Sequence, residues 1–261
     1  KPKPQPPKPL CTIPLEYVTR SVRLDRDSDF TAWLGSFIDP LIVEGLKDLY
    51  QIGVTKYGDV IFFQIDEQGR CRSGKIMKYK RQDGHRIKDE DCPNRINWIH
   101  NPLIWRGVLP KDWQLSQCLF GAHLLPRFPD RKVVLVESEK SALVGSAFLP
   151  QYIWLSTGGK DVNLKPESLS ILKGRDVTAI PDLDAIEHWT KKLKAFPYIK
   201  VVPLMRKAAE QYALPDNADV ADWLVMKYGT PQTGSSDSRD STEPTEPHEA
   251  KSGLEPWEEI L

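Results

Sequence analysis

Short apolar runs alternate with segments of helical periodicity between residues 131 and 229, and this alternation restricts the possible folds more than any other feature. We expect strands at 133–136, 152–155, 177–180 and 199–203, and helices at 139–148, 166–172, 185–196 and 220–227. The first run is uniformly apolar, which is typical of a strand buried on both faces. Such alternation favours a parallel sheet with right-handed crossovers. The sequence therefore predicts an α/β fold, with a parallel sheet flanked by helices.

Acidic residues directly follow two of these expected strands. Glu137 follows the first, and Asp182 and Asp184 follow the third. Parallel strands bring their carboxyl ends to one edge, and an extended segment would point Asp182 and Asp184 to the same side. Three converging carboxylates repel one another without a cation, and together they can hold Mg²⁺ or Mn²⁺ against phosphates. The alternative is helix capping, by Glu137 or Ser138 in one helix and by Asp184 in the next.

Other residues near these strands can contact a phosphate. Lys140 lies on the helix after the first strand, and Gly158-Gly159-Lys160 follows the second strand. A Gly-Gly turn lets backbone N–H groups approach a phosphate, and Lys160 adds positive charge. The alternatives are an ordinary loop and solvated lysines. We expect Glu139, beside Lys140, to be a solvated surface charge.

Basic residues are most concentrated on a predicted β-hairpin with strands at 59–66 and 70–79, and a further strand is expected after Asp83-Gly84. Alternation along a strand would present several of them on one face as a strip that follows phosphates, with Tyr79 available for stacking on bases. Edge strands also carry Lys and Arg to prevent aggregation, which is the alternative. The residues expected to bind nucleic acid are Arg70, Arg72, Lys75, Lys78, Tyr79, Lys80 and Arg81.

The chain divides into four predicted segments. Residues 1–16 form a Pro/Lys-rich linker, 17–130 a small α+β domain that contains the basic hairpin, 131–229 the α/β domain, and 230–261 a disordered acidic tail. Within 29–50 the apolar residues recur at helical spacing and are interrupted at Asp39-Pro40, so we expect two helices. The apolar residues near the end of the tail can bind a protein partner; an inert or back-docked end is the alternative.

Composition limits the class of protein. No apolar run approaches the roughly 20 residues of a membrane span and no secretory signal is present, so we expect a cytoplasmic protein without a membrane partner. The four cysteines lie far apart, which indicates neither a zinc site nor a disulfide framework. The tail has eight acidic residues against Arg239 and Lys251, which leaves residues 1–229 at about +6. That charge suits a polyanionic partner.

The order of these motifs resembles the Toprim domain of primases, topoisomerases and related nucleases. The shared pattern is a strand that ends in Glu137, a Gly turn at Gly158-Gly159 after the next strand, and a strand that ends in Asp182-Leu183-Asp184. The match covers about 131–228. Upstream segments, among them 62–66, 72–77 and 118–121, resemble a domain that precedes Toprim-like modules in primase-like proteins of bacterial mobile elements.

The sequence also departs from the Toprim pattern. Ser138 stands where many members have Gly, and Ile186-Glu187-His188 follows where primase-type members often carry Gly. Asp219-Val220-Ala221-Asp222 resembles the acidic segment that closes many primase-type domains, although we favour Asp219 as a helix N-cap.

The resemblance implies a primase-like protein of DNA replication or mobilisation. It would bind DNA, in particular single strands, and nucleotides, and would be an Mg²⁺- or Mn²⁺-dependent primase-type nucleotidyltransferase with Glu137 as general acid/base and metal ligand. One alternative is a catalytically inactive Toprim-fold protein that binds nucleic acid or acts as a scaffold. Another is a Toprim nuclease. The chain begins without Met, so we also expect a missing upstream module, which the resemblance would make a zinc ribbon.

Overall fold

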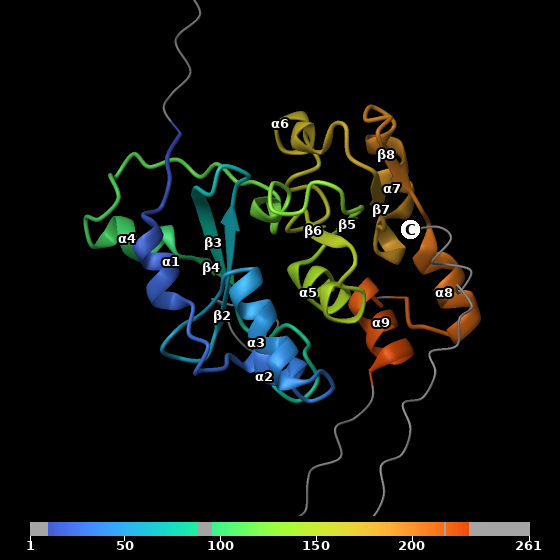
Figure 1. Ribbon diagram of the computed structural model, residues 1–261, viewed down its shortest axis with the longest axis horizontal. Helices are drawn as coiled ribbons and strands as arrows, with labels where there is room; N and C mark the ends of the chain where they lie inside the picture. The colour runs from blue at the N-terminus through green and yellow to red at the C-terminus, as the bar shows by residue number, and fades with distance from the viewer. Residues whose placement is uncertain (1–9, 88–95, 217, 230–261) are drawn as a thin grey trace, which may run out of the picture.

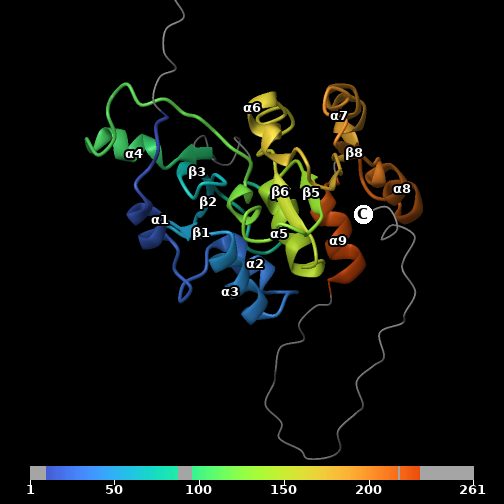
Figure 2. The ribbon, with the colours of Figure 1, turned by 45° about the horizontal axis from the view of Figure 1, so that its top comes forward.

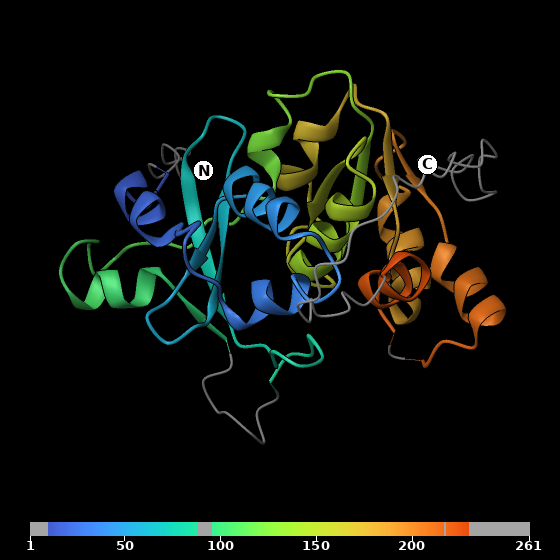
Figure 3. The ribbon, with the colours of Figure 1, turned by 60° about the horizontal axis from the view of Figure 1, so that its bottom comes forward.

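The computed structural model describes residues 10–87, 96–216 and 218–229, and these form two sheets that lie side by side (Figures 1 and 3). The predicted tail at 230–261 and the first nine residues of the predicted linker lie outside the described residues. In the described part of the chain, no helix is long and apolar enough to cross a bilayer.

The first half contains an antiparallel sheet with strand order β1-β2-β3-β4. The predicted hairpin is confirmed by β2 (Val60–Ile65) and β3 (Cys71–Met77), which pair antiparallel. Two strands were not predicted, β1 (Ile52–Val54) and β4 (Ile96–Trp98). Each has only three residues, which is too short for a period of two to be recognised in the sequence. The further strand expected after Asp83-Gly84 can be followed only to residue 87, where Arg86 forms an isolated bridge with Tyr79. All six residues of β2 are buried, so the hairpin forms part of the core.

Helices surround this sheet, and the predicted break at Asp39-Pro40 is confirmed. The helices are α1 (Leu15–Ser21), α2 (Asp29–Leu34), α3 (Pro40–Leu49) and α4 (His100–Trp105). Pro40 occupies the first turn of α3, where no N–H is needed, and the Asp39 side chain accepts a hydrogen bond from Leu41 N–H. Of the predicted linker, Ile13 is 2% exposed and bridges Cys71. The folded part therefore begins before residue 17.

The second half contains the predicted parallel sheet. Its strands are β5 (Val133–Val136), β6 (Ile153–Ser156), β7 (Val177–Ala179) and β8 (Ile199–Val201), all parallel, in the order β6-β5-β7-β8. The chain leaves β5 toward β6 on one side and then returns to β7 on the other side. The gap between the carboxyl ends of β5 and β7 is therefore a topological switch point, where ligands bind in open parallel sheets.

Helices cover both faces of the parallel sheet, as the fold class requires. In Figure 2, α5 (Glu139–Phe148) and α9 (Val220–Tyr228) lie on one side, and α6 (Pro166–Leu169) and α7 (Ile186–Leu193) on the other. The predicted helix at 166–172 includes a 3-10 segment, Ser170–Leu172, and a second 3-10 segment, Leu183–Ala185, precedes α7. One helix, α8 (Leu204–Tyr212), was not predicted.

The two halves share one hydrophobic core. Phe120 pairs with Ser156 at the edge of β6, and its ring stacks on Tyr50 at 5.3 Å and contacts Phe62 edge-on at 5.8 Å. The Tyr50 hydroxyl donates to the Trp154 carbonyl at 3.0 Å. One cluster of buried residues includes side chains from both sheets. The site at the switch point is therefore built on a continuous packed frame.

Candidate metal and phosphate site

The structure brings Glu137 and Asp182 to the same edge of the parallel sheet. Strands β5 and β7 are neighbours, with Leu135 opposite Ala179, and Ile180 N–H donates to the Leu135 carbonyl at 2.9 Å. Glu137 follows β5 directly, and Asp182 lies three residues past the end of β7. The two carboxylates thus leave adjacent strands at the topological switch point.

Each of these carboxyl groups has one buried oxygen without a hydrogen-bond partner among the described residues, Glu137 Oε2 and Asp182 Oδ1. Burial, followed by the negative charge of Asp184, raises the pKa of Glu137, and the positive charges of Lys160 and Arg86 oppose this rise. Burial also raises the pKa of Asp182 well above its usual value. A buried carboxylate oxygen that lacks a donor favours a proton or a cation.

Asp182 is surrounded by other acids. After burial, the charges of Asp219 and Glu137 are the next causes of its raised pKa, and a hydrogen bond from Val220 N–H acts in the opposite direction. Acidic side chains are therefore concentrated at this edge of the sheet. A divalent cation would relieve this repulsion more completely than a single proton.

Asp184 does not point where an extended segment would place it. Leu183–Ala185 is a 3-10 helix, so the period of two ends at Asp182, and the expected parallel orientation of the two aspartates is wrong. The Asp184 side chain is 71% exposed and pairs with Lys160 at 2.9 Å. Lys160 also donates to the Asp184 carbonyl at 2.9 Å, and its pKa is raised, mainly by the hydrogen bond with the Asp184 side chain. Asp184 is not a helix cap.

Glu137 and Asp182 have the ligand chemistry that Mg²⁺ prefers. Among the described residues, no group of three His, Cys, Asp or Glu side chains could hold a metal ion. Mg²⁺ usually keeps several waters and takes only one or two carboxylates together with substrate phosphates. Glu137 and Asp182 supply two buried oxygens without hydrogen-bond donors, which is enough for this kind of ligation. Asp184 instead pairs with Lys160 through Oδ2.

Lys140 is held by two other acids. Its ammonium group is buried and lies 2.9 Å from Asp219 and 2.8 Å from Asp222. Burial alone would lower the pKa of Lys140, but the charges of Asp219 and Asp222 outweigh it and raise the pKa above the usual value. Asp219 also forms a reciprocal capping box with Asp222 at the start of α9, so its predicted role as an N-cap is confirmed.

The backbone conformation of the Gly158-Gly159 turn requires glycine. Gly158 and Gly159 have φ angles of 77° and 148°, which side chains other than that of glycine rarely allow. Gly158 N–H donates to Ser156 Oγ at 3.3 Å, and its carbonyl accepts from Lys75 at 3.0 Å. The N–H and C=O groups of Gly158 therefore both have hydrogen-bond partners within the protein. Phosphate binding by the turn remains a prediction.

Most of the basic hairpin residues have internal partners. Arg70 and Arg72 pair with Asp66 at 2.8 and 3.2 Å, and Lys78 pairs with Asp59 at 2.8 Å. These cations are held by the protein's own carboxylates. Contact of the strip with nucleic acid remains a prediction.

The remaining members of the predicted strip differ in exposure. Tyr79 is 4% exposed, with its ring 4.9 Å from Phe30 in the core, so it is not presented for stacking. Lys80 and Arg81 are exposed, and Arg81 lies 3.9 Å from Asp29. Arg70, at the other end of the strip, is also exposed, with a 48% exposed side chain, but it is paired with Asp66.

Glu139 was expected on the surface, and this expectation is wrong. Its side chain is 3% exposed and pairs with Lys75 of β3 at 3.2 Å. The partner lies 64 residues away in the chain, and no local sequence signal connects the two residues. The contacts of Lys140 with Asp219 and Asp222 likewise join residues that are far apart in the chain. Both contacts arise only when the two sheets and α9 come together.

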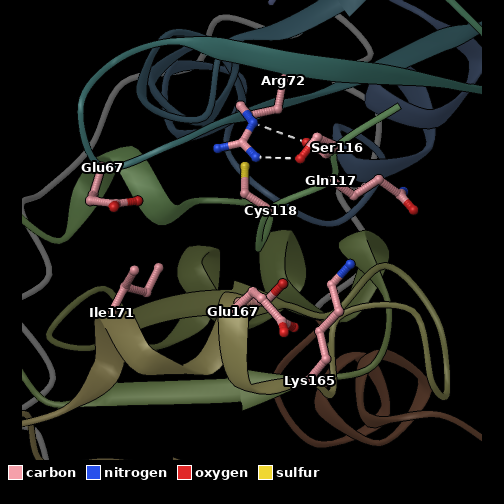
Figure 4. Close-up of a pocket in the computed structure, with 9 residues that line it drawn as sticks. Glu67, Arg72, Ser116, Gln117, Cys118, Lys165, Glu167 and Ile171 are labelled. Atoms are coloured by element: carbon pink, nitrogen blue, oxygen red, sulfur yellow. Dashed lines mark hydrogen bonds between the residues drawn. The ribbon is translucent and has the colours of Figure 1, made fainter. Parts of the chain in front are cut away.

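A cavity of about 200 Å³ lies between the halves (Figure 4). Neither Glu137 nor Asp182 lines it. Arg72 in its wall donates to the Ser116 carbonyl at 3.0 Å and to Ser116 Oγ at 2.6 Å. Its wall contains two acidic residues, Glu67 and Glu167, as well as two basic residues, Arg72 and Lys165. The charges of these residues therefore do not favour an anion in the cavity. This cavity is separate from the carboxylate site.

Comparison with known proteins places the chain in a family. A family model described as "Domain of unknown function (DUF6371)" matches residues 28–183. The chain belongs to this family. The matched range of DUF6371 includes the antiparallel sheet and ends directly after Asp182. No protein with a curated functional description matches the chain in sequence.

Solved structures similar to this DUF6371 member include primase fragments. The Escherichia coli primase catalytic core is 12% identical, with 82% of this chain and 74% of that chain covered and a TM-score of 0.49. The primase fragment of the bacteriophage T7 primase-helicase protein is 16% identical, with 87% and 82% covered and a TM-score of 0.47. The RNA polymerase domain of Mycobacterium tuberculosis primase DnaG is 12% identical, with 81% and 71% covered and a TM-score of 0.43. Function does not follow from likeness at this level.

Proposed function

We propose that this chain is a primase-related, Toprim-like protein that acts on nucleic acid in DNA replication or mobilisation by Mg²⁺- or Mn²⁺-dependent nucleotidyl transfer. The observation that carries the proposal is the pair of buried oxygens without hydrogen-bond donors, on Glu137 and Asp182, at the switch point of a parallel sheet. The order of Glu137, Gly158-Gly159 and Asp182-Leu183-Asp184, which resembles the Toprim pattern, supports it from the sequence.

Glu137 has the environment that general acid/base chemistry needs. Burial and the charge of Asp184 raise its pKa, so the carboxyl group can exchange a proton closer to neutral pH than a free glutamate can. In the proposed reaction it takes the proton from the attacking hydroxyl, whose oxygen bonds to the α-phosphorus of the incoming nucleoside triphosphate while the bond from that phosphorus to the departing pyrophosphate breaks. A bound Mg²⁺ or Mn²⁺ would neutralise charge on the phosphates of the transferring nucleotide.

Asp182 would hold the cation together with Glu137. Its buried Oδ1 has no hydrogen-bond donor among the described residues, while Val220 N–H restrains the group. Asp184 and Lys160 form the exposed rim of the site. Lys160 could exchange its carboxylate partner for a substrate phosphate, which would release Asp184 toward the cation. This exchange would make substrate and metal bind together.

The partners proposed are single-stranded DNA and nucleotides. The exposed Lys80 and Arg81 on the hairpin are the residues of the predicted strip best placed to meet a backbone phosphate. The proposed cellular location is the cytoplasm. A protein partner for the acidic tail concerns residues outside those described.

A template-dependent incorporation assay tests the proposal. The protein is incubated with single-stranded circular DNA, labelled ribonucleotides and Mg²⁺ or Mn²⁺, and the products are separated by length. We expect short labelled products that fall at least about 100-fold with Glu137→Gln, because loss of a general base has effects of this size. Glu187→Gln, an exposed residue paired with Arg206, is the matched control and should act like the wild type.

The same assay separates two alternative functions. Shortened DNA strands without labelled products would indicate a nuclease that uses the same carboxylates. An absence of both products, with retained binding to single-stranded DNA, would indicate a catalytically inactive binding protein. The pairing of Asp184 with Lys160 and the presence of Ser138 in place of Gly favour that last alternative over the nuclease.

A further inference from the structure

A buried ion pair joins the antiparallel sheet to the edge of the parallel sheet. Lys75 Nζ lies 3.3 Å from Glu139 Oε1 and 3.2 Å from Glu139 Oε2, and it also donates to the Gly158 carbonyl at 3.0 Å. The side chains of Lys75 and Glu139 are only 10% and 3% exposed. A buried charge is costly unless it is paired and hydrogen-bonded, so this contact must form as a unit.

Strand alternation explains why Lys75 points into the junction. Lys75 lies opposite Phe62 in the antiparallel pair, and opposed residues share a face of the sheet. The Phe62 ring contacts Phe120, which pairs with β6. The same face of β3 is therefore turned toward the parallel sheet, and Lys75 is buried there.

The two groups that Lys75 contacts come from the chain segments that leave β5 and β6. Glu139 is two residues after Glu137, in the first turn of α5, and Gly158 is two residues after the end of β6. A Cβ atom added to Gly158 would lie 3.4 Å from Glu139 Oε1 and 3.5 Å from Gln64 Nε2. The turn, the start of α5 and the face of β2 are thus in close contact.

We infer that Lys75 is a positioning residue for the carboxylate site. By holding Glu139 and the Gly158 carbonyl, it fixes the start of α5 and hence the direction in which the Glu137 side chain leaves β5. This inference rests on the proposed function of Glu137 as a metal ligand, and it gives Lys75 a role other than contact with nucleic acid. Groups that orient a metal ligand commonly change metal affinity by about 10–100-fold when removed.

The opposing explanation is that the pair only holds the two halves together. A double variant, Lys75→Met with Glu139→Leu, separates the two roles, because apolar residues of similar volume often replace a buried ion pair without loss of stability. The single variant Lys75→Arg retains the charge. Lys78→Met is the matched control, since Lys78 lies on the same hairpin but pairs with Asp59 instead.

Two readouts test the inference, Mg²⁺ titration by calorimetry and hydrogen exchange of the backbone amides at 136–140 and 156–160. We expect the double variant to unfold at the wild-type urea midpoint but to bind Mg²⁺ at least tenfold more weakly, with faster exchange at both segments. Lys75→Arg should keep affinity within about threefold of the wild type, and Lys78→Met should match it.

The outcomes distinguish this inference from the proposed function. Wild-type protein that binds no Mg²⁺ would refute the proposed function, and hydrogen exchange would still decide whether Lys75 orders the two segments. Unchanged exchange at 136–140 and 156–160 in the double variant would overturn the positioning role. Unchanged Mg²⁺ affinity in a stable double variant would overturn it equally.

Discussion

The ionised form of Asp182 destabilises the folded state, so the free energy of unfolding should depend on pH. Its folded-state pKa lies well above the value of an unfolded aspartate, because burial and the charges of Asp219 and Glu137 penalise the ionised form. The folded state therefore binds a proton that the unfolded state does not hold between these two pKa values. Stability contributed by this proton increases as pH falls through the folded-state pKa and is absent above it.

We predict that Asp182→Asn raises the free energy of unfolding at pH 8, in metal-free buffer, by on the order of 1–2 kcal/mol, because it removes a buried charge without a paired cation. The gain over wild type should shrink as the pH is lowered from 8 toward the pKa of an unfolded aspartate. Urea unfolding at a series of pH values measures this. Asp176→Asn, at an exposed position paired with Lys132, is the control. A gain that is independent of pH would contradict the assignment.

At the scale of single residues, the sequence predicted which acidic residues lie at the sheet edge better than it predicted the directions of their side chains. Glu137 and Asp182 were placed at one edge because strand ends and sheet topology follow from local pattern. The orientation of Asp184 depends on a 3-10 turn at Leu183–Ala185, and no periodicity in the sequence predicts this turn. The burial of Tyr79 follows from packing against Phe30, which lies 49 positions earlier in the chain.

At the scale of elements, α5 packs on β6 through a glycine. A Cβ atom on Gly145 would lie 2.4 Å from the Trp154 ring, which is fully buried. The Trp154 indole donates to the Leu149 carbonyl at 3.1 Å, and its own carbonyl accepts from Tyr50. The ring therefore has little freedom to move away from an added methyl group.

We predict that Gly145→Ala lowers the free energy of unfolding by about 1–3 kcal/mol, the usual range for overpacking a core. Gly45→Ala is the matched helical control, since nothing lies within 4 Å of its added Cβ. It should raise the free energy of unfolding by about 0.5–1 kcal/mol through helix propensity. Urea midpoints report both values. Equal effects of the two substitutions would show that α5 does not press on Trp154.

Helix and strand positions were largely predictable, because amphipathic period and terminal residues are local signals. Asp39-Pro40 marked a helix boundary, and Asp219 marked another. The sequence did not predict β1 and β4, because three residues are too few to show the alternation of a strand. It did not predict α8, because this helix follows a strand and has no capping side chain at its start. The ion pair of Lys75 with Glu139 belongs to no single element, so no local signal predicts it.

At the scale of the whole molecule, one core crosses the boundary between the two sheets. Tyr50 and Phe62 from the first half contact Phe120, which pairs with β6 of the second half. The separate domains expected for 17–130 and 131–229 therefore share buried surface. Elements that share a core usually unfold together.

We predict a single unfolding transition for the full chain. Circular dichroism and tryptophan fluorescence should give the same urea midpoint, and the calorimetric and van't Hoff enthalpies should agree. Phe120→Ala should lower that midpoint for both signals together, by about 3–5 kcal/mol in free energy of unfolding. Two resolved transitions, or an effect of Phe120→Ala on one signal alone, would mean that the halves fold independently.

The central claim is that Glu137 and Asp182 form a divalent-cation site, and titration of Mg²⁺ and Mn²⁺ into the full chain by calorimetry tests it most directly. We predict saturable binding by the wild type, weakened at least tenfold by Glu137→Gln or Asp182→Asn and unchanged by Asp176→Asn. No binding by the wild type, even with nucleotide and single-stranded DNA present, would contradict the claim, as would variants that bind like the wild type.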